Sequence, residues 1–148
     1  MADTKQIFEA LMIEAQSDMR SAKLLLDGTE FSRSVYHSQQ AIEKAMKASL
    51  ALAGIVITDD HWISDRFMRS FSTMPNIHNI IRDAKYLERQ ATKSRYPLFS
   101  DADRPIWIPS REYTEHDAED AYRKALTIFK NIKQFLKEKH NISIVEIL

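Results

Sequence analysis

The segment from Phe31 to Gly54 constrains the fold most, because it combines an uninterrupted helical period with two chemically different faces. With about 3.6 residues per helical turn, one face gathers mostly apolar side chains and the opposite face gathers polar and cationic ones. The first face comprises Val35, Ile42, Met46, Ser49 and Ala53. The opposite face comprises Arg33, His37, Gln40, Lys44 and Lys47. Such a helix buries the first face and leaves the second for solvent, a ligand or a partner.

Glycine and proline are scarce in the chain, with two glycines and four prolines among 148 residues. This leaves few of the turns that a fold of many short strands needs, so we predict an all-α protein. The length suits one domain with a continuous core, and we therefore expect residues 1–148 to form a single helical domain.

The charge balance and the cysteine content narrow the function. The 21 basic and 21 acidic residues balance, so any binding of nucleotides or nucleic acid must depend on a local patch. The absence of cysteine excludes disulfides, thiol catalysis and thiolate metal sites. The chain has neither a signal-peptide pattern nor an apolar run of about 18 residues, so we expect a cytoplasmic protein without membrane association.

Apolar residues recur every three or four positions in three further long segments, which predicts three more long helices. Between the second and third of the four long helices, we expect a connector, Ile55 to Asp60, and then a helix that begins near His61 or Trp62 and is interrupted at Pro75. Asp59 and Asp60 are its candidate caps. The three further periodic segments, each predicted to form a long helix, are Lys5 to Leu26, Asn76 to Thr92, and the residues after Thr114 as far as Lys139.

Three local signals place the ends of the predicted helices. Asp27 and Gly28 end the first helix, and because the following linker is short, the second helix must return antiparallel to the first. Gly54 is at the expected C-terminal position of the second helix. Thr114 and Asp117 form a capping pair for the last helix.

Residues 94–113 break every period and contain three prolines together with Tyr96, Phe99 and Trp107. Loops of this length are usually functional or disordered, and these aromatic residues favour an ordered flap over one end of the bundle. Trp107 could stack on a nucleobase or close the end of the bundle. The apolar tail Ser143 to Leu148 could dock on the body or on a neighbouring molecule.

The polar face of the second helix is the first candidate site. Cations and amides along one helical face can pair with phosphate oxygens, and Arg95 could add a bidentate contact from the loop. A solvated surface and a dimer interface are the alternatives for the same side chains. The predicted ligand-binding residues are Arg33, His37, Gln40, Lys44, Lys47 and Arg95.

The second helix also resembles the signature helix of HEPN domains (higher eukaryotes and prokaryotes nucleotide-binding). The resemblance starts from the run Tyr36 to Lys47 and extends to the arginine-tyrosine-proline element at 95–97 and to the last helix from Tyr113. It implies an up-and-down bundle of four or five helices that is often a homodimer and is frequently encoded beside a small nucleotidyltransferase. It does not select one activity, since some HEPN proteins are metal-independent ribonucleases with an Arg-x4-6-His motif, some have been proposed to bind nucleotides, and others have no assigned activity.

Arg111 and His116 match the ribonuclease spacing, with four residues between them. In such a mechanism the histidine is the general acid or base, and the arginine stabilises the charge that develops on phosphorus. Many nuclease members have a tyrosine two positions after the histidine, where this chain has Ala118. The five histidines are scattered singly, so the sequence predicts neither a metal site nor a cofactor.

We interpret the chain as a dimeric module that binds a nucleotide or a nucleic-acid phosphate and acts with a nucleotidyltransferase partner. On this interpretation it is not an enzyme by itself. The first alternative is a metal-independent, toxin-like ribonuclease, as in a toxin–antitoxin pair, with Arg111 and His116 as catalytic residues. The second alternative is an assembly module without a ligand.

Overall fold

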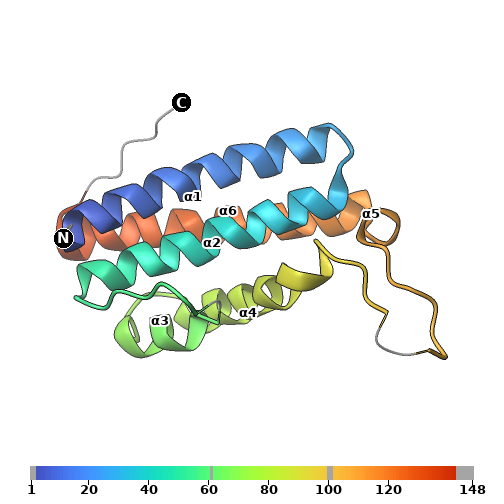
Figure 1. Cartoon of the computed structure of the whole chain (residues 1–148). Helices are drawn as coiled ribbons and strands as arrows, with labels where there is room; N and C mark the ends of the chain where they lie inside the picture. Colours follow the sequence, from blue (N-terminus) through green and yellow to red (C-terminus); the bar gives the residue numbers. More distant parts are fainter. Residues whose placement is uncertain (1–2, 61, 100–101, 143–148) are drawn as a thin grey trace.

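A computed structural model describes residues 3–60, 62–99 and 102–142. Within them, four long helices alternate in direction and form an up-and-down bundle, with one short helix between the second and third long helices and another before the last (Figure 1). The all-α prediction is confirmed. No helix in these ranges combines the length and the apolar character that a membrane span requires. The helices are α1 (Thr4–Asp27), α2 (Phe31–Leu52), α3 (Ser64–Ser70), α4 (Ile77–Lys93), α5 (Pro109–Glu112) and α6 (Glu115–His140).

Helix α2 is the central element of the bundle, since α1, α4 and α6 all pack against it. Small residues allow α1 and α2 to approach closely: Ala15 and Ala22 on α1 are fully buried, as is Ser34 on α2. The Ser34 hydroxyl donates a hydrogen bond of 2.7 Å across the interface to the carbonyl oxygen of Ala22. Contacts on three sides leave only a narrow stripe of α2 open to solvent.

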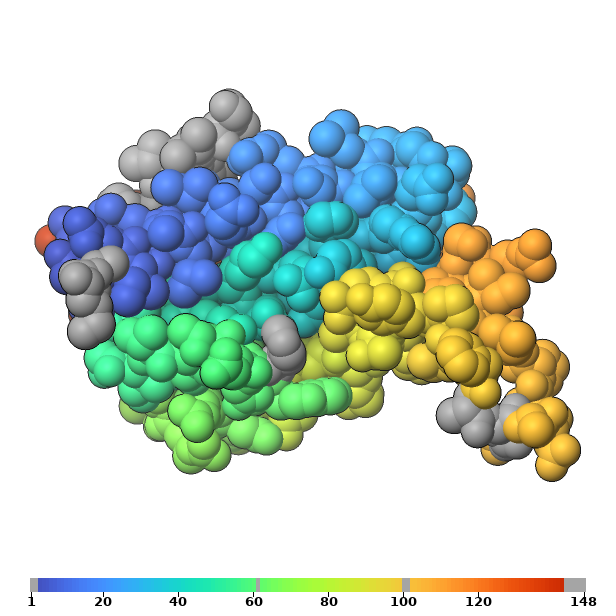
Figure 2. Space-filling model, in the orientation of Figure 1, coloured from blue at the N-terminus to red at the C-terminus, as the bar shows by residue number. Residues whose placement is uncertain are grey.

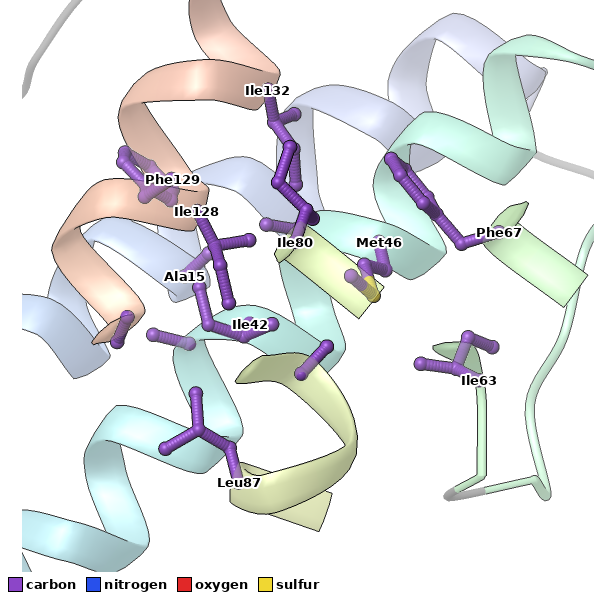
Figure 3. Packing of buried hydrophobic residues seen from close by; sticks show 14 of the residues in the cluster. Ala15, Ile42, Met46, Ile63, Phe67, Ile80, Leu87, Ile128, Phe129 and Ile132 are labelled. Carbon is purple, nitrogen blue, oxygen red and sulfur yellow. The ribbon is translucent and has the colours of Figure 1, made fainter. Parts of the chain in front are cut away.

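The hydrophobic core lies between the long helices and extends beneath α3 (Figure 3). Side chains from five helices meet there, including Ala15, Met46, Phe67, Leu87 and Ile128. Most of the apolar residues that define the helical periods in the sequence lie in the core, because one face of each helix is turned to the centre. Ala53, at the end of the predicted apolar face of the second helix, is exposed.

Local sequence determines several of the helix ends. A reciprocal capping box starts α6, in which Thr114 Oγ1 accepts from the Asp117 amide and the Asp117 carboxylate accepts from the Thr114 amide. After α2, Gly54 has a positive φ of 84°. The amide of Ile55 then donates to the Leu50 carbonyl oxygen and the amide of Gly54 to that of Ala51, which is the hydrogen-bond pattern of a Schellman motif.

The end of α1 differs from the prediction in one detail. The left-handed position belongs to Thr29, with a φ of 64°, and not to Gly28, whose φ is −85°. The amide of Glu30 donates to the Leu25 carbonyl oxygen, so the same Schellman pattern closes the helix one residue later than the glycine. A Cβ on Gly28 would lie 3.2 Å from the Leu24 carbonyl oxygen. The glycine therefore serves a close backbone approach, and the threonine accepts the strained conformation.

The short helix before α4 begins and ends differently from the prediction. Helix α3 starts at Ser64 and stops at Ser70, well before Pro75. Asp60 accepts from the amide of Trp62, but the cap of α3 comes from Glu88 on α4. The Glu88 carboxylate accepts hydrogen bonds from the amides of Ile63 (3.0 Å) and Ser64 (2.8 Å) and from the Ser64 hydroxyl (2.9 Å). A cap from another helix leaves no local signal in the sequence.

Residues 94–99 and 102–108 form an arm that projects from one end of the bundle (Figure 1). A single antiparallel bridge joins Leu98 to Trp107. The indole N–H of Trp107 donates to the Lys93 carbonyl oxygen at 2.8 Å, and the ring makes an edge contact with Tyr113. Trp107 therefore anchors the base of the arm. The predicted loop 94–113 also contains helix α5, which periodicity could not reveal because it is only one turn long.

Candidate functional site

The exposed stripe of α2 occupies its N-terminal half. Figure 2 shows α2 reaching the surface between α1 and the end of α4. The side chains that are at least partly exposed there are Phe31, Arg33, Tyr36, His37, Gln40 and Lys44. From Ala45 to Ala51 every residue of α2 is buried. The polar face predicted from the sequence is therefore open over about three turns and closed beyond them.

Lys47 lies in the closed half, which corrects its predicted place in the ligand-binding face. Its exposed fraction is 8%, and its Nζ is 3.4 Å from the buried Glu43 carboxylate one turn earlier. Glu43 also accepts from the side-chain amide of Gln39 at 3.3 Å. Because α2 is enclosed all around at this level, helical spacing alone misplaced Lys47 on the solvent side.

Asp18 on α1 is a residue of the site that the sequence analysis missed. It is 8% exposed, and its two carboxylate oxygens contact His37 Nδ1 at 2.9 Å and Lys44 Nζ at 2.5 Å. One buried carboxylate on α1 thus holds two members of the predicted polar face of α2. The available signal was the position of Asp18 between Ala15 and Ala22, on the apolar stripe of α1, where an acidic side chain needs a partner.

Arg33 and Arg95 are the cations of the site that no carboxylate neutralises within the described residues. Arg33 is exposed and donates to the hydroxyl of its neighbour Ser32 at 3.0 Å. Arg95 follows α4, and its guanidinium carbon lies 4.8 Å from the ring centre of Tyr36 and 5.1 Å from that of Tyr96. Arg33 lies one helical turn before Tyr36 on α2, so the two arginines come from the same exposed part of the face, and Arg95 is the one that stacks on the ring.

Gln40 completes the open stripe. Its side-chain amide donates to the side-chain Oε1 of Gln39 at 2.8 Å, and the residue is partly exposed between the levels of His37 and Lys44. We define the α2 face as Arg33, Tyr36, His37, Gln40, Lys44 and Arg95, with Asp18 beneath it. It presents two unneutralised guanidinium groups, an aromatic ring, an imidazole and an amide on one surface.

The candidate ribonuclease pair lies at the same end of the molecule. Arg111 is on α5 and His116 is in the first turn of α6, and both elements sit at the bundle end that carries the start of α2 and the end of α4 (Figure 1). Both side chains are exposed, and neither forms a hydrogen bond or ion pair within residues 3–60, 62–99 and 102–142. Ala118 is buried in the core, so the family tyrosine position faces inward here.

No group of three or more histidine, aspartate or glutamate side chains in the described parts of the chain is arranged to hold a metal ion.

Comparison with known proteins identifies the family. Residues 8–138 match the family model of the HEPN domain. The chain belongs to the HEPN family. The match covers α2 and α4 completely and all but the outer ends of α1 and α6, and it includes the whole α2 face.

This HEPN protein is similar to a curated archaeal protein and to two solved structures. The protein named "Putative toxin MJ1304" of Methanocaldococcus jannaschii is 36% identical over 137 residues, which is 86% of this chain and 87% of the relative. The crystal structure of ST0689, an archaeal HEPN homologue, has a TM-score of 0.66 at 27% identity and covers 93% of this chain and 100% of its own. The crystal structure of TT1696 from Thermus thermophilus has a TM-score of 0.70 at 24% identity and covers 90% and 98%. The TT1696 structure, at 24% identity, supports the fold alone.

Proposed function

We propose that this HEPN protein binds the phosphate groups of a nucleotide or a nucleic acid on the α2 face, as a homodimer that acts in the cytoplasm with a small nucleotidyltransferase partner. One observation carries the binding proposal: Arg33 is exposed one turn before Tyr36, Arg95 stacks on the Tyr36 ring, and neither arginine has a carboxylate partner in the described residues. Guanidinium groups pair with phosphate oxygens in bidentate geometry, and an aromatic ring on the same surface can stack on a base.

The spacing of the face suits a ligand with more than one phosphate or with a phosphate and a sugar. Arg33 and Lys44 are eleven residues apart on one helix, which corresponds to roughly 16 Å at the rise of an α-helix. Lys44 already pairs with Asp18, so its remaining N–H groups supply a weaker contact than the two arginines. The strongest anion binding therefore belongs to the N-terminal end of the face.

A thermal-shift screen of the purified protein with nucleotides, dinucleotides and short RNAs tests the proposal. Ligand at about 100 times its Kd stabilises the native state by roughly 2.7 kcal/mol, which is a shift of several degrees for a domain of this size. Arg33→Ala and Arg95→Ala each reduce the shift. Arg66→Ala on α3, an exposed arginine at the other end of the bundle, leaves it unchanged. An equal shift in all four proteins contradicts the site.

A metal-independent ribonuclease is the second candidate function. Two observations favour it: the relative from Methanocaldococcus jannaschii is named as a toxin, and Arg111 and His116 are exposed without partners in the described residues, at the bundle end that carries Arg33 and Arg95. The two sets of residues could serve one substrate, with the α2 face holding the strand and His116 transferring a proton.

Gel analysis of the RNA samples from the same screen decides between the two functions. RNA cleavage that persists in the presence of a chelator, and that is lost in His116→Ala, supports the ribonuclease. Stabilisation with intact RNA supports a binding module. A protein that shows neither a shift nor cleavage is an assembly module.

The homodimer is supported by the apolar surface of the arm. Tyr96 is 56% exposed and Phe99 is 72% exposed, and Leu98 and Ile106 are also exposed near them in the arm. Exposed apolar side chains gathered on one projection mark a surface that associates with another molecule. A sedimentation-velocity profile with a single dimeric species supports the assembly, whereas a monomer at high protein concentration contradicts it.

A further inference from the structure

We infer that Asp18 and His37 make the α2 face selective for ribose over deoxyribose, with His37 accepting a hydrogen bond from the ribose 2′-hydroxyl of a bound nucleotide or RNA strand and Asp18 positioning the imidazole. This inference rests on the proposed function, since it concerns the sugar that is attached to the bound phosphate. It assigns the α2 face a second recognition element beside its cations.

The contacts of Asp18 determine which ring nitrogen of His37 carries the proton. A carboxylate paired with a lysine ammonium accepts hydrogen bonds and donates none. Because Asp18 Oδ1 lies 2.9 Å from His37 Nδ1, this nitrogen is the donor. When the ring is neutral, its lone pair is therefore on Nε2, which has no hydrogen-bond partner in the described residues. An acceptor at Nε2 suits a hydroxyl donor and does not suit a phosphate oxygen.

Lys44 holds Asp18 from the other side, so the arrangement is rigid on both oxygens. Its Nζ lies 2.5 Å from Asp18 Oδ2, and Asp18 itself is almost fully buried. A buried carboxylate with two charged or polar donors is costly to rearrange, because any movement leaves a charge without a partner. The imidazole plane is further limited by an edge contact with Tyr36, whose ring centre lies 5.2 Å away.

The neighbours of His37 place a phosphate next to the hydroxyl acceptor. Arg33 lies one turn earlier on the same helix, and Arg95 stacks on Tyr36 beside it. A ligand whose phosphate meets these guanidinium groups brings its sugar to the level of His37. The ribose 2′-hydroxyl is the group by which a protein distinguishes RNA from DNA at a given site, and an acceptor fixed beside the phosphate contacts is positioned to read it.

Three hexanucleotide probes of the same sequence test the inference by fluorescence anisotropy: one with ribose, one with 2′-deoxyribose and one with 2′-O-methylribose. The last two lack the hydroxyl donor. The wild-type protein binds the ribose probe roughly five to ten times more tightly than either of them, which is the effect of one hydrogen bond. The ribose probe is run on a gel afterwards to confirm that it is intact.

Two variants separate recognition by His37 from general binding. His37→Ala binds all three probes equally, at the affinity that the wild type has for the deoxyribose probe. His78→Ala, an exposed histidine on α4, keeps the preference of the wild type. Equal binding of the three probes by the wild type, or a preference that persists in His37→Ala, overturns the inference and leaves phosphate binding intact. Failure to bind any probe overturns the proposed function itself.

The positioning role of Asp18 has its own spectroscopic test. In the imidazole nitrogen NMR spectrum of the wild type, the neutral ring of His37 carries its proton on Nδ1. Asp18→Asn can donate to that nitrogen, so the ring changes to the tautomer protonated on Nε2 and the ribose preference falls. A purely structural role of Asp18 predicts reduced stability with an unchanged tautomer and an unchanged preference, which contradicts the assignment.

Discussion

Thr29 stores backbone strain that a single substitution can release. Its φ of 64° lies in the left-handed region, which a β-branched residue rarely occupies. Thr29→Gly removes the strain but adds backbone entropy to the unfolded chain, and we expect a net gain of roughly 1 kcal/mol in the free energy of unfolding. Urea denaturation measures the change. Thr29→Ala keeps a Cβ at the same position and should gain less, so a larger gain in the alanine variant argues against strain at φ.

Tyr113 links the bundle end to α4, and its contribution to the free energy of unfolding decreases at alkaline pH. Its hydroxyl donates to Gln90 Oε1 at 2.7 Å, and burial raises its pKa to about 12, with smaller contributions from Tyr86 and Asp117. Because the folded-state pKa is above the ordinary value near 10, the contribution of Tyr113 is complete below pH 10 and is lost as the pH rises through 12.

The comparison of Tyr113→Phe with the wild type isolates this effect from the titration of lysines. The variant lacks the hydrogen bond and leaves Gln90 Oε1 without that donor, so we expect it to be less stable at neutral pH by about 1–3 kcal/mol. The difference between the two proteins should shrink between pH 10 and pH 12. Thermal unfolding measures this difference in stability between the two proteins. A difference that stays constant from pH 10 to pH 12 would show that the pKa of the Tyr113 hydroxyl is not raised in the folded state.

Residues whose roles are local could be predicted from the sequence. Thr114 and Asp117 are three positions apart and form the expected capping box, and Gly54 ends α2 in the left-handed conformation. Asp18 could not be placed in the same way, since its partners His37 and Lys44 are 19 and 26 residues away. The sequence shows the cations of the α2 face, but the fold decides which of them are neutralised.

At the level of elements, α3 depends on a side chain from α4. Glu88 is the acceptor for the amides of Ile63 and Ser64 at the start of α3, and α3 has only seven residues, too few to form a helix independently. Glu88→Ala leaves these buried donors without an acceptor, and we expect a loss of about 2–4 kcal/mol of unfolding free energy, together with faster hydrogen exchange of the α3 amides.

The pH dependence of the Glu88→Ala effect follows from the pKa of the carboxyl group. Burial raises the pKa of Glu88, while the hydrogen bonds from Ser64 and Ile63 oppose the shift. A raised pKa means that Glu88 contributes most to stability below the ordinary pKa of glutamate, about 4.3, and less as the pH rises through the folded-state value. The loss in the variant should therefore be largest in acid. Glu9→Ala, an exposed glutamate on α1, should show no such trend.

The elements with a strong period could be predicted closely, and the short ones could not. The observed α4, Ile77–Lys93, differs by one residue at each end from the range expected from its apolar stripe. The sequence predicts a helix before Pro75 but not the bounds of α3, and it does not predict α5, because seven and four residues are too few for a period to be recognised. Pro109 at the first position of α5 is compatible with a helix start, but three prolines in the same segment indicated a loop.

At the scale of the whole molecule, the structure concentrates the candidate chemistry at one end of the bundle. The start of α2, the end of α4, α5 and the start of α6 meet there (Figure 1), so residues far apart in the sequence, such as Arg33, Arg95 and Arg111, share one region. The opposite half of α2 is buried. This arrangement explains why only part of the polar face predicted from the sequence is available to a ligand.

The salt dependence of ligand binding reports how many cations of the molecule contact phosphates of the ligand. Two guanidinium contacts to phosphates predict that log Kd rises with log salt with a slope of roughly 1.4 for a single-stranded probe, since each neutralised phosphate contributes about 0.7. A slope near zero would indicate that stacking on Tyr36 dominates, and a much steeper slope would require further cations, such as Lys44 or Arg111. Fluorescence titrations between about 50 and 200 mM salt measure the slope.

The most direct test of phosphate binding on the α2 face is the affinity of the Arg33→Ala, Arg95→Ala double variant for a single-stranded RNA hexamer, measured by fluorescence anisotropy beside the wild type and Arg66→Ala. We predict that the double variant binds at least about a hundredfold more weakly, because it loses two charge-assisted contacts. Its unfolding free energy should be within about 0.5 kcal/mol of the wild type, and Arg66→Ala should bind normally. Unchanged affinity in a folded double variant would contradict phosphate binding on this face.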